Sequence, residues 1–203
     1  MITPEALDVS RETFARLEAY AALLEKWNPK INLVSRESLG DLWVRHIQDS
    51  AQLYALAPNP CKIWADLGSG GGFPGLVIAI MALEHGTPAE VILVESDQRK
   101  ATFLRTVIRE LSLPARVICD RIERIPPLNA DVLSARALAD LTALLGFAAQ
   151  HLAPDGTALF PKGVQWEKEL QAAQSQWNFT YHVDKSLTET GPVILSVKGV
   201  SRV

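Results

Sequence analysis

A glycine-rich stretch follows the first apolar run that is typical of a buried strand. It reads Asp66-Leu67-Gly68-Ser69-Gly70-Gly71-Gly72-Phe73-Pro74-Gly75. Glycines let the backbone turn tightly and leave room for a ligand against the main chain, and proline suits the first turn of a following helix. Five glycines in eight positions cost backbone entropy that a plain connection would not need. The stretch therefore predicts a ligand-binding turn.

The nature of the ligand depends on the acid that precedes the glycines. Residues 70–75 satisfy the G-x-G-x-x-G pattern of dinucleotide sites. That pattern presents helix N–H groups to a pyrophosphate, which a carboxylate at the strand end would repel. Asp66 instead suits a ligand with a cationic end, such as the ammonium and sulfonium of S-adenosylmethionine. We therefore expect Asp66, Gly68 and Gly70 to bind S-adenosylmethionine.

Three further positions follow strands at the edge where such a sheet binds its ligand. Glu95 ends the second strand, 29 residues after Asp66, where a carboxylate accepts hydrogen bonds from both ribose hydroxyls. Dinucleotide folds use an acid there too, so Glu95 supports an adenosyl ligand without choosing the cofactor. Ile122 and Glu123 follow the third strand, where an adenine would be sandwiched. Arg136 follows the fourth and would pair with a cofactor carboxylate or an RNA phosphate, the alternative being a surface cation.

Short apolar runs and helical patterns alternate from residue 62 onward. Strands are expected at 63–66, 91–95, 116–119, 131–134 and 157–160, and helices at 74–83, 99–111 and 138–152. Such alternation predicts a parallel sheet with helices on both sides. After a helix at 166–177, strands at 179–183 and 193–198 have no helix between them, which implies an antiparallel edge pair. The predicted fold is α/β, a doubly wound, seven-stranded, mostly parallel sheet of Rossmann-like type.

The first sixty residues have a helical period instead. Apolar residues predict one helix from Pro4 to the Asn28-Pro29 pair and a second from about 38 to 56. No linker divides the chain. We expect a single domain over residues 1–203, with 1–60 as an N-terminal helical extension and 61–203 as the Rossmann-like catalytic core.

Composition narrows the class of protein. A chain of 203 residues suits one domain, and two cysteines exclude a disulfide framework or a cysteine-rich zinc site, so no metal is expected. We find no apolar run of membrane length and no export signal, and we expect a cytoplasmic protein. The net charge of −3 argues against bulk attraction to nucleic acid. Residues 98–136 nevertheless carry eight cations and four carboxylates, mostly interpreted as solvated helix faces, with a binding face as the alternative.

Several motifs together resemble the bacterial glucose-inhibited division protein B family over nearly the whole chain. They are Trp27-Asn28-x-x-Ile31-Asn32-Leu33, Arg45-His46-x-x-Asp49-Ser50, the glycine turn with Phe73-Pro74-Gly75, Lys100-x-x-Phe103-Leu104 and Ala135-Arg136-Ala137. The resemblance implies a class I S-adenosylmethionine-dependent methyltransferase fold with an N-terminal helical cap. It further implies methylation of N7 of one guanine in 16S ribosomal RNA of the small subunit.

The resemblance also implies site residues. The family's cofactor contacts fall on Gly68, Phe73, the pair Ile122-Glu123, and Arg136, of which only Phe73 has no independent support from its position. The serine that often precedes the arginine is Ala135 here. The pair Lys162-Gly163 near the fifth strand is also similar to the family's.

Methylation at guanine N7 makes modest demands on the chain. N7 carries a lone pair and no proton, so positioning and desolvation suffice, with Arg136 as the positioning residue and no general base. Carbon-5 pyrimidine methylation needs a cysteine nucleophile, but Cys61 precedes the first strand. Amine methylation typically shows an Asp/Asn-Pro-Pro-aromatic motif after the fourth strand, whereas Pro126-Pro127 precedes it.

RNA contacts are expected from cations around the cofactor mouth. We expect Arg36, Arg45, His46 and Lys162, with Arg136, to contact phosphates. Structural ion pairs are the alternative, and we favour that interpretation for His46 with Asp49, three residues later. We expect the chain to be a monomer that does not contact a membrane. Its expected partner is 16S rRNA or the small ribosomal subunit. Two other functions stay open: a small-molecule methyltransferase, and a non-catalytic S-adenosylmethionine- or nucleotide-binding assembly factor.

Overall fold

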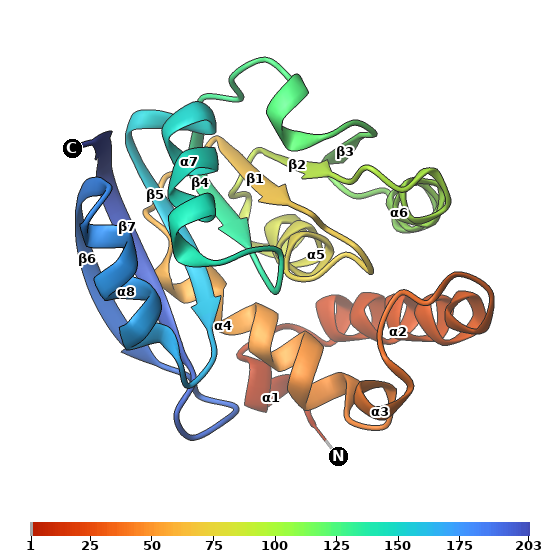
Figure 1. Ribbon diagram of the computed structural model, residues 1–203. Coiled ribbons are helices and arrows are strands. Elements are labelled where there is room, and N and C mark those ends of the chain that lie inside the picture. The colour runs from red at the N-terminus through yellow and green to blue at the C-terminus, as the bar shows by residue number, and fades with distance from the viewer. Residues whose placement is uncertain (1) are drawn as a thin grey trace.

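Seven strands form one sheet in the computed structural model, which describes residues 2–203 (Figure 1). The strand order is β3-β2-β1-β4-β5-β7-β6. The first five strands in this order, β3-β2-β1-β4-β5, pair in parallel. Strand β7 is antiparallel to both of its neighbours, β5 and β6. The strands are β1(Ile63–Leu67), β2(Glu90–Val94), β3(Ala115–Ile118), β4(Ala130–Ala135), β5(Leu152–Lys162), β6(Trp177–Lys185) and β7(Val193–Arg202). The predicted doubly wound, mostly parallel sheet is confirmed.

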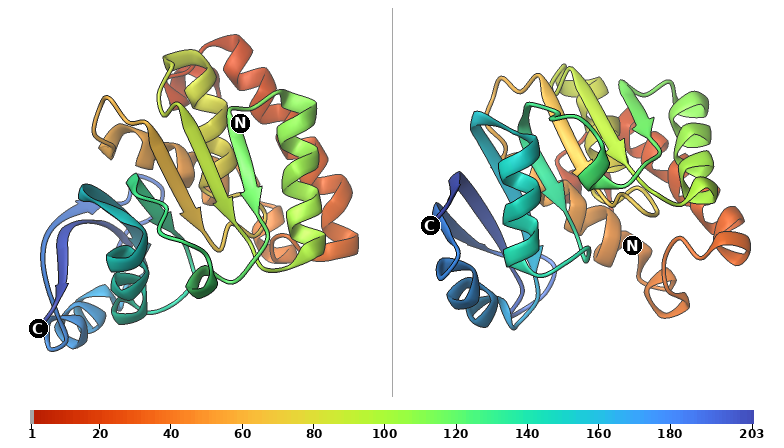
Figure 2. Two further views of the ribbon diagram at one scale, coloured as in Figure 1. Left: turned by 90° about the horizontal axis from the view of Figure 1, so that it is seen from above. Right: turned by 45° about the horizontal axis from the view of Figure 1, so that its top comes forward.

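Helices cover both faces of this sheet (Figure 2). Helices α5(Gly75–His85) and α6(Gln98–Leu111) cover one face together with the N-terminal helices. Helices α7(Leu141–His151) and α8(Trp166–Gln174) cover the other. Within residues 2–203, none of these helices combines the length and the apolar character that a bilayer crossing needs.

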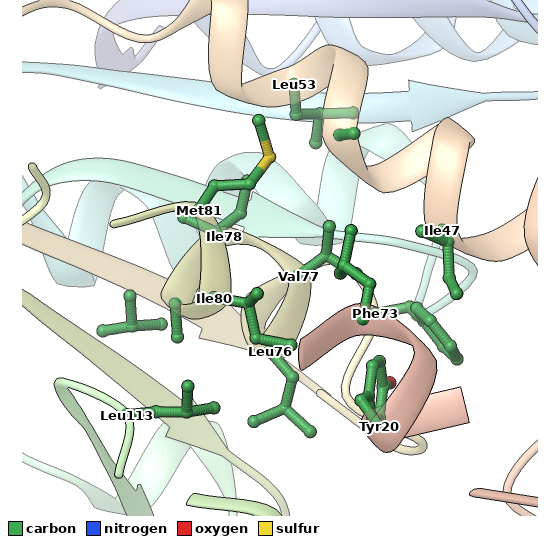
Figure 3. Packing of buried hydrophobic residues seen from close by; sticks show 14 of the residues in the cluster. Tyr20, Ile47, Leu53, Phe73, Leu76, Val77, Ile78, Ile80, Met81 and Leu113 are labelled. Carbon is green, nitrogen blue, oxygen red and sulfur yellow. The ribbon is translucent and has the colours of Figure 1, made fainter. Parts of the chain in front are cut away.

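The larger apolar core lies between α5 and the N-terminal helices. Figure 3 shows Tyr20 and Ile47 from those helices beside Phe73, Leu76 and Val77 of the glycine turn and α5. Each of these side chains is at most 5% exposed. Because burying one such side chain contributes about 1.5–3 kcal/mol, the N-terminal helices are part of the core that holds the turn.

The prediction of one continuous helix from Pro4 to Asn28-Pro29 is wrong in two ways: the helix is interrupted, and it ends later than expected. The structure has α1(Pro4–Leu7) and α2(Arg11–Ile31), separated by Asp8 in the left-handed region (φ 53°). Ser10 then caps α2. Helix α2 continues through Pro29, because a proline removes only one helical hydrogen bond and this one lies in the last turn.

The second predicted helix, over 38–56, is also wrong in its continuity. A short α3(Arg36–Leu39) ends at Gly40, and a π-helical segment, Trp43–Gln48, then leads into α4(Asp49–Leu56). A π-helical turn is wider than an α-helical one and is frequent at functional sites. This segment contains Arg45 and His46.

Other elements also differ from their expected bounds, among them α7 and the helix before β6, and β5 is longer, Leu152–Lys162 against 157–160. Helix α7 begins at Leu141 rather than 138, because the Asp140 carboxylate caps it by accepting a hydrogen bond from the Ala143 N–H at 2.9 Å. The helix expected to reach Trp177 ends at Gln174, and β6 begins at Trp177.

Gly75 is a position where any side chain would disturb the turn. A Cβ there would overlap Leu93 Cδ2 and lie 2.8 Å from Asp66 Oδ2. We expect Gly75→Ala to lower the free energy of unfolding by about 2–4 kcal/mol in denaturant titrations. Gly163→Ala is the matched control, since nothing lies within 4 Å of its added Cβ. Equal stability of both variants would contradict this packing.

Candidate active site

Hydrogen bonds within the chain hold the glycine turn closed. The N–H groups of Gly68 and Ser69 both donate to the Val94 carbonyl, at 2.9 and 3.1 Å. The Gly70 N–H donates to Glu95 Oε2 at 2.8 Å. A dinucleotide site would need such N–H groups free for a pyrophosphate. Within residues 70–75, the Gly70 N–H is already bonded to Glu95 and the Gly75 N–H to Asp66, so the G-x-G-x-x-G match does not indicate a dinucleotide.

Asp66 lies fully buried beneath the turn. Its Oδ1 accepts a hydrogen bond from Ser134 Oγ at 2.8 Å, and its Oδ2 accepts one from the Gly75 N–H at 3.2 Å. The carboxylate thus occupies the N-terminus of α5, where a pyrophosphate would otherwise bind. Asp66 lines none of the cavities described below. The geometry therefore makes it a residue that holds the turn, which differs from the expected direct ligand contact.

Burial raises the pKa of Asp66 from 3.8 to about 6, against the hydrogen bonds from Ser134, Ser69 and Gly75, which lower it. Between those two pH values the folded chain holds a proton that the unfolded chain has released, so stability falls as pH rises. We expect the stability of the wild type relative to Asp66→Asn to fall by on the order of 2–3 kcal/mol from pH 4 to pH 7. Denaturant titrations across that range measure the difference; a constant difference would contradict this environment of Asp66.

A cavity of about 430 Å³ opens beside the turn. Six expected cofactor-binding residues line it: Gly68, Gly70, Glu95, Ile122, Glu123 and Arg136. Leu138 and Phe147 also line it and were not among the residues expected from the sequence. Phe147 lies on α7 within an apolar pattern, and only the folded arrangement distinguishes it from a core residue. Ser96, Lys100, Asp120 and Arg121 complete the polar part of the wall.

The lining of this cavity fits an adenosyl group. Glu95 is 8% exposed, and its two oxygens accept from the N–H groups of Gly70 and Asp97. A carboxylate has roughly four acceptor positions, so capacity remains for ribose hydroxyls. The apolar side chains of Ile122 and Leu138, with Phe147, suit the faces of an aromatic base.

Arg136 is held in place by the π-helical segment and the start of α4. Its Nη1 donates to the Arg45 carbonyl at 3.0 Å and to Asp49 Oδ2 at 3.4 Å. Its Nη2 lies 2.7 Å from His46 Nδ1, and its guanidinium lies 5.3 Å from the centroid of the Phe73 ring. The side chain is 19% exposed. A cation is thereby fixed at the edge of the cavity.

His46 is a neutral acceptor in this arrangement. Burial, together with the charges of Arg136 and Arg45, lowers its pKa to about 4. Its ring stacks on Phe73 with centroids 4.9 Å apart, and its buried Nε2 has no partner in residues 2–203. The favoured ion pair with Asp49 is absent from these residues, because Arg136 bridges the two side chains. Contact of His46 with an RNA phosphate stays a prediction, in which the neutral ring would be a hydrogen-bond partner rather than a cation.

Phe73 links the N-terminal helices to the turn. Its ring lies 5.3 Å from that of Tyr20, whose hydroxyl donates to the Gly71 carbonyl at 2.6 Å. Phe73 lines a smaller cavity of about 280 Å³ with His46, Arg136 and the glycine turn. The resemblance alone pointed to Phe73; no period or spacing in the sequence does.

A larger cavity of about 630 Å³ lies on the other side of residues 136–139, which line both it and the cofactor-sized cavity. The loop between β6 and β7 forms one wall and is bonded to the N-terminal helices, since Thr188 Oγ1 donates to Asp49 Oδ1 at 3.1 Å. The pair of cavities, with Arg136 between them, provides space for two reactants at one edge of the sheet.

Most of the expected RNA-binding cations are already paired. Lys162 Nζ lies 2.6 Å from Glu169 Oε2 and donates to the Ala139 carbonyl at 3.1 Å, with its side chain 8% exposed. Arg45 pairs with Glu189 at 3.5 Å. Arg36 is exposed and lines neither large cavity. The structure thus gives Lys162 the structural role and does not bring Arg36 to the cavity.

Neither alternative methylation chemistry has its residues at this edge. Cys61 precedes β1 and lines a separate cavity with Tyr54 and His85, and burial raises the pKa of its thiol to about 12. Pro126-Pro127 precedes β4. The two cavities therefore have neither the thiolate for carbon-5 methylation nor the Pro-Pro motif for amine methylation.

The GidB family model, described as rRNA small subunit methyltransferase G, matches residues 13–194. The curated ribosomal RNA small subunit methyltransferase G of Ruegeria pomeroyi is 58% identical over 205 residues, which covers 100% of each chain. A solved SAM-dependent methyltransferase from Aquifex aeolicus matches with a TM-score of 0.59 and 12% identity, covering 88% of this chain and 98% of that one. A variant of MtNAS in complex with S-adenosylmethionine matches with a TM-score of 0.60 and 17% identity, covering 95% of this chain and 77% of that one. At these identities the solved structures show the shared fold.

Proposed function

Because this chain belongs to the GidB family of rRNA small subunit methyltransferases G, we propose that it transfers the methyl group of S-adenosylmethionine to N7 of one guanine in 16S rRNA. The observation that carries the proposal is the pair of adjoining cavities with Arg136 between them. The smaller one fits the donor, and the larger one, of about 630 Å³, has room for a guanine.

The donor would be held by residues of the cavity of about 430 Å³, which we call the donor cavity. Glu95 would accept hydrogen bonds from the ribose hydroxyls, while Ile122, Leu138 and Phe147 would contact the adenine. Gly68 and Gly70 leave the main chain accessible to the ligand. When bound, S-adenosylmethionine supplies an electrophilic methyl group on a sulfonium.

The acceptor would need little chemical help. Guanine N7 has a lone pair and no proton, so the chain supplies positioning and exclusion of water rather than a base. His46 also lines the larger cavity, but its Nδ1 already bonds Arg136 and is not free to act as a base. Arg136, fixed by three groups of the chain, would position the acceptor or the carboxylate of the donor.

The remaining expectations become part of this proposal. We infer that residues 1–203 act as one methyltransferase domain, with 1–60 as the helical extension that holds the turn and Arg136. We also infer that the chain acts as a monomer. A small-subunit rRNA substrate favours the cytoplasm.

Labelled methyl transfer from S-adenosylmethionine tests the proposal. The purified chain is incubated with naked 16S rRNA, with assembling small subunits, with mature subunits and with a protein-free metabolite extract. We expect label in at least one of the RNA substrates. Label confined to metabolites would replace the proposal with a small-molecule methyltransferase. No label in any of them, with donor binding intact, would support a non-catalytic binding factor.

A further inference from the structure

The cations around the larger cavity do not form a positive surface. Three cations line this cavity, Arg45, Arg136 and Lys162, together with four carboxylates, Asp49, Asp140, Glu169 and Glu189. Each of the three cations pairs with one of these carboxylates. The whole chain is also acidic, with a net charge of −3. RNA binding depends on phosphate neutralisation, and cations already paired with carboxylates contribute less to it than unpaired ones.

A groove between α2 and α6 has the opposite balance of charge. This α2–α6 groove has a volume of about 390 Å³ and contains three cations and one carboxylate. Figure 1 shows α6 above α2, and the two helices are in contact. The groove is lined by Leu23, Lys26, Trp27, Lys30, Thr106, Arg109 and Glu110.

The cations of the groove are available to a ligand. Lys26 and Lys30 stand one helical turn apart on α2, and neither pairs with a carboxylate of residues 2–203. The Arg109 side chain is 77% exposed and reaches Glu110 only at 4.0 Å. Arg105, one turn before Arg109, is also exposed and unpaired within these residues. The groove therefore presents three cations, of which only Arg109 has a carboxylate within 4.0 Å among residues 2–203.

Both helices connect this groove to the candidate active site. Lys100, in the first turn of α6, lines the donor cavity, and Arg109 lies nine residues further on, about 14 Å along the helix. Helix α2 ends at Ile31, just before Leu33 and Val34, which line the small cavity beside the glycine turn. An RNA with its target base in the site would reach the groove with its flanking backbone.

We propose that the α2–α6 groove binds the sugar–phosphate backbone of the rRNA that flanks the target guanine, through Lys26, Lys30 and Arg109. This inference rests on the proposed function. It assigns phosphate contact to the flank of the domain and leaves base recognition to the larger cavity. It also gives a binding role to part of the excess positive charge of residues 98–136, most of which was expected to lie on solvated helix faces.

The test uses the double variant Lys26→Glu/Lys30→Glu of the full chain. RNA affinity is measured across salt concentrations with the small-subunit RNA that the wild type methylates. We expect affinity to fall about 10- to 100-fold at 0.1 M salt, and the slope of log affinity against log salt to become shallower by about 1.4 to 1.8 for two lost phosphate contacts. S-Adenosylmethionine affinity and thermal unfolding should stay unchanged, because both lysines are exposed.

Two matched variants separate local from bulk charge. Lys168→Glu/Lys198→Glu makes the same change of charge at exposed lysines of α8 and β7, and we expect little change in the slope. Glu110→Gln removes the one carboxylate of the groove and should tighten binding. An unchanged slope in the groove variant, or an equal loss in the control variant, would overturn the inference.

A last outcome distinguishes partners. If the groove variant methylated naked RNA normally and failed only on protein-bound particles, the groove would bind an acidic protein, and the RNA inference would be wrong. Failure of the wild type to methylate any RNA would instead refute the proposed function.

Discussion

Replacing Arg136 with alanine is expected to lower kcat/KM for methyl transfer about 10²- to 10³-fold. Arg136 stands between the two cavities and is fixed by the Arg45 carbonyl, His46 Nδ1 and Asp49 Oδ2. One charge-assisted hydrogen bond contributes about 1.5–3 kcal/mol, and misplacement of a reactant costs further rate. Arg136→Lys keeps the charge but lacks the planar fork that reaches all three partners, so we expect a loss of about 10-fold or more.

Two measurements separate this effect from unfolding. Arg136→Ala leaves Asp49 without its cation in a half-buried place, so thermal unfolding and S-adenosylmethionine affinity are measured beside the rate. Arg121→Ala is the matched control, because Arg121 also lines the donor cavity but is exposed and, within residues 2–203, pairs only with Glu123 at 3.7 Å. Equal activity of the Arg136 and Arg121 variants, with both folded, would show that Arg136 does not position a reactant.

Replacing Glu95 with alanine is expected to raise the Kd for S-adenosylmethionine about 10²-fold. The change removes the carboxylate acceptor proposed for the ribose hydroxyls, at about 1.5–3 kcal/mol for each charge-assisted bond. It also removes the acceptor of the Gly70 N–H. Glu95→Gln keeps one acceptor oxygen and should lose about 10-fold. Calorimetry measures both values.

Asp120→Ala serves as the control for Glu95. Asp120 lines the same cavity but is exposed, and its carboxylate accepts only from the Arg121 N–H in residues 2–203. We expect less than a threefold change for Asp120→Ala. If folded Glu95→Ala bound the donor as tightly as the wild type, the assignment of the ribose to Glu95 would be wrong.

Local sequence predicted the elements that form from short apolar runs. Parallel strands buried on both faces produce such runs, so β1, β2 and β4 were expected close to their observed bounds. The glycine turn could also be located from local sequence, because the backbone freedom of glycine is a property of the residue itself. The break between α1 and α2 at Asp8 could not, because the helical period of the apolar residues continues across it.

Contacts between segments that lie far apart in the chain could not be predicted from the sequence. Arg136 was expected from its place after β4, but its partners come from the π-helical segment and α4, about 90 positions earlier. That segment was expected to be α-helical, and one His46–Asp49 pair was favoured in place of the bridge through Arg136. Lys162 was expected at RNA, and only the fold shows Glu169 beside it. The burial that neutralises His46 is likewise a product of packing against Phe73.

The position of the transferred methyl group tests the central claim most directly. Small-subunit RNA methylated by the chain is digested, and the modified nucleoside and its atom are identified by mass spectrometry and by chain cleavage specific for N7-methylguanine. One 7-methylguanosine per 16S rRNA is expected, because N7 has a lone pair and no proton and so needs only the positioning that the site offers. A methyl group on an exocyclic amine or on carbon 5 of a pyrimidine would contradict it.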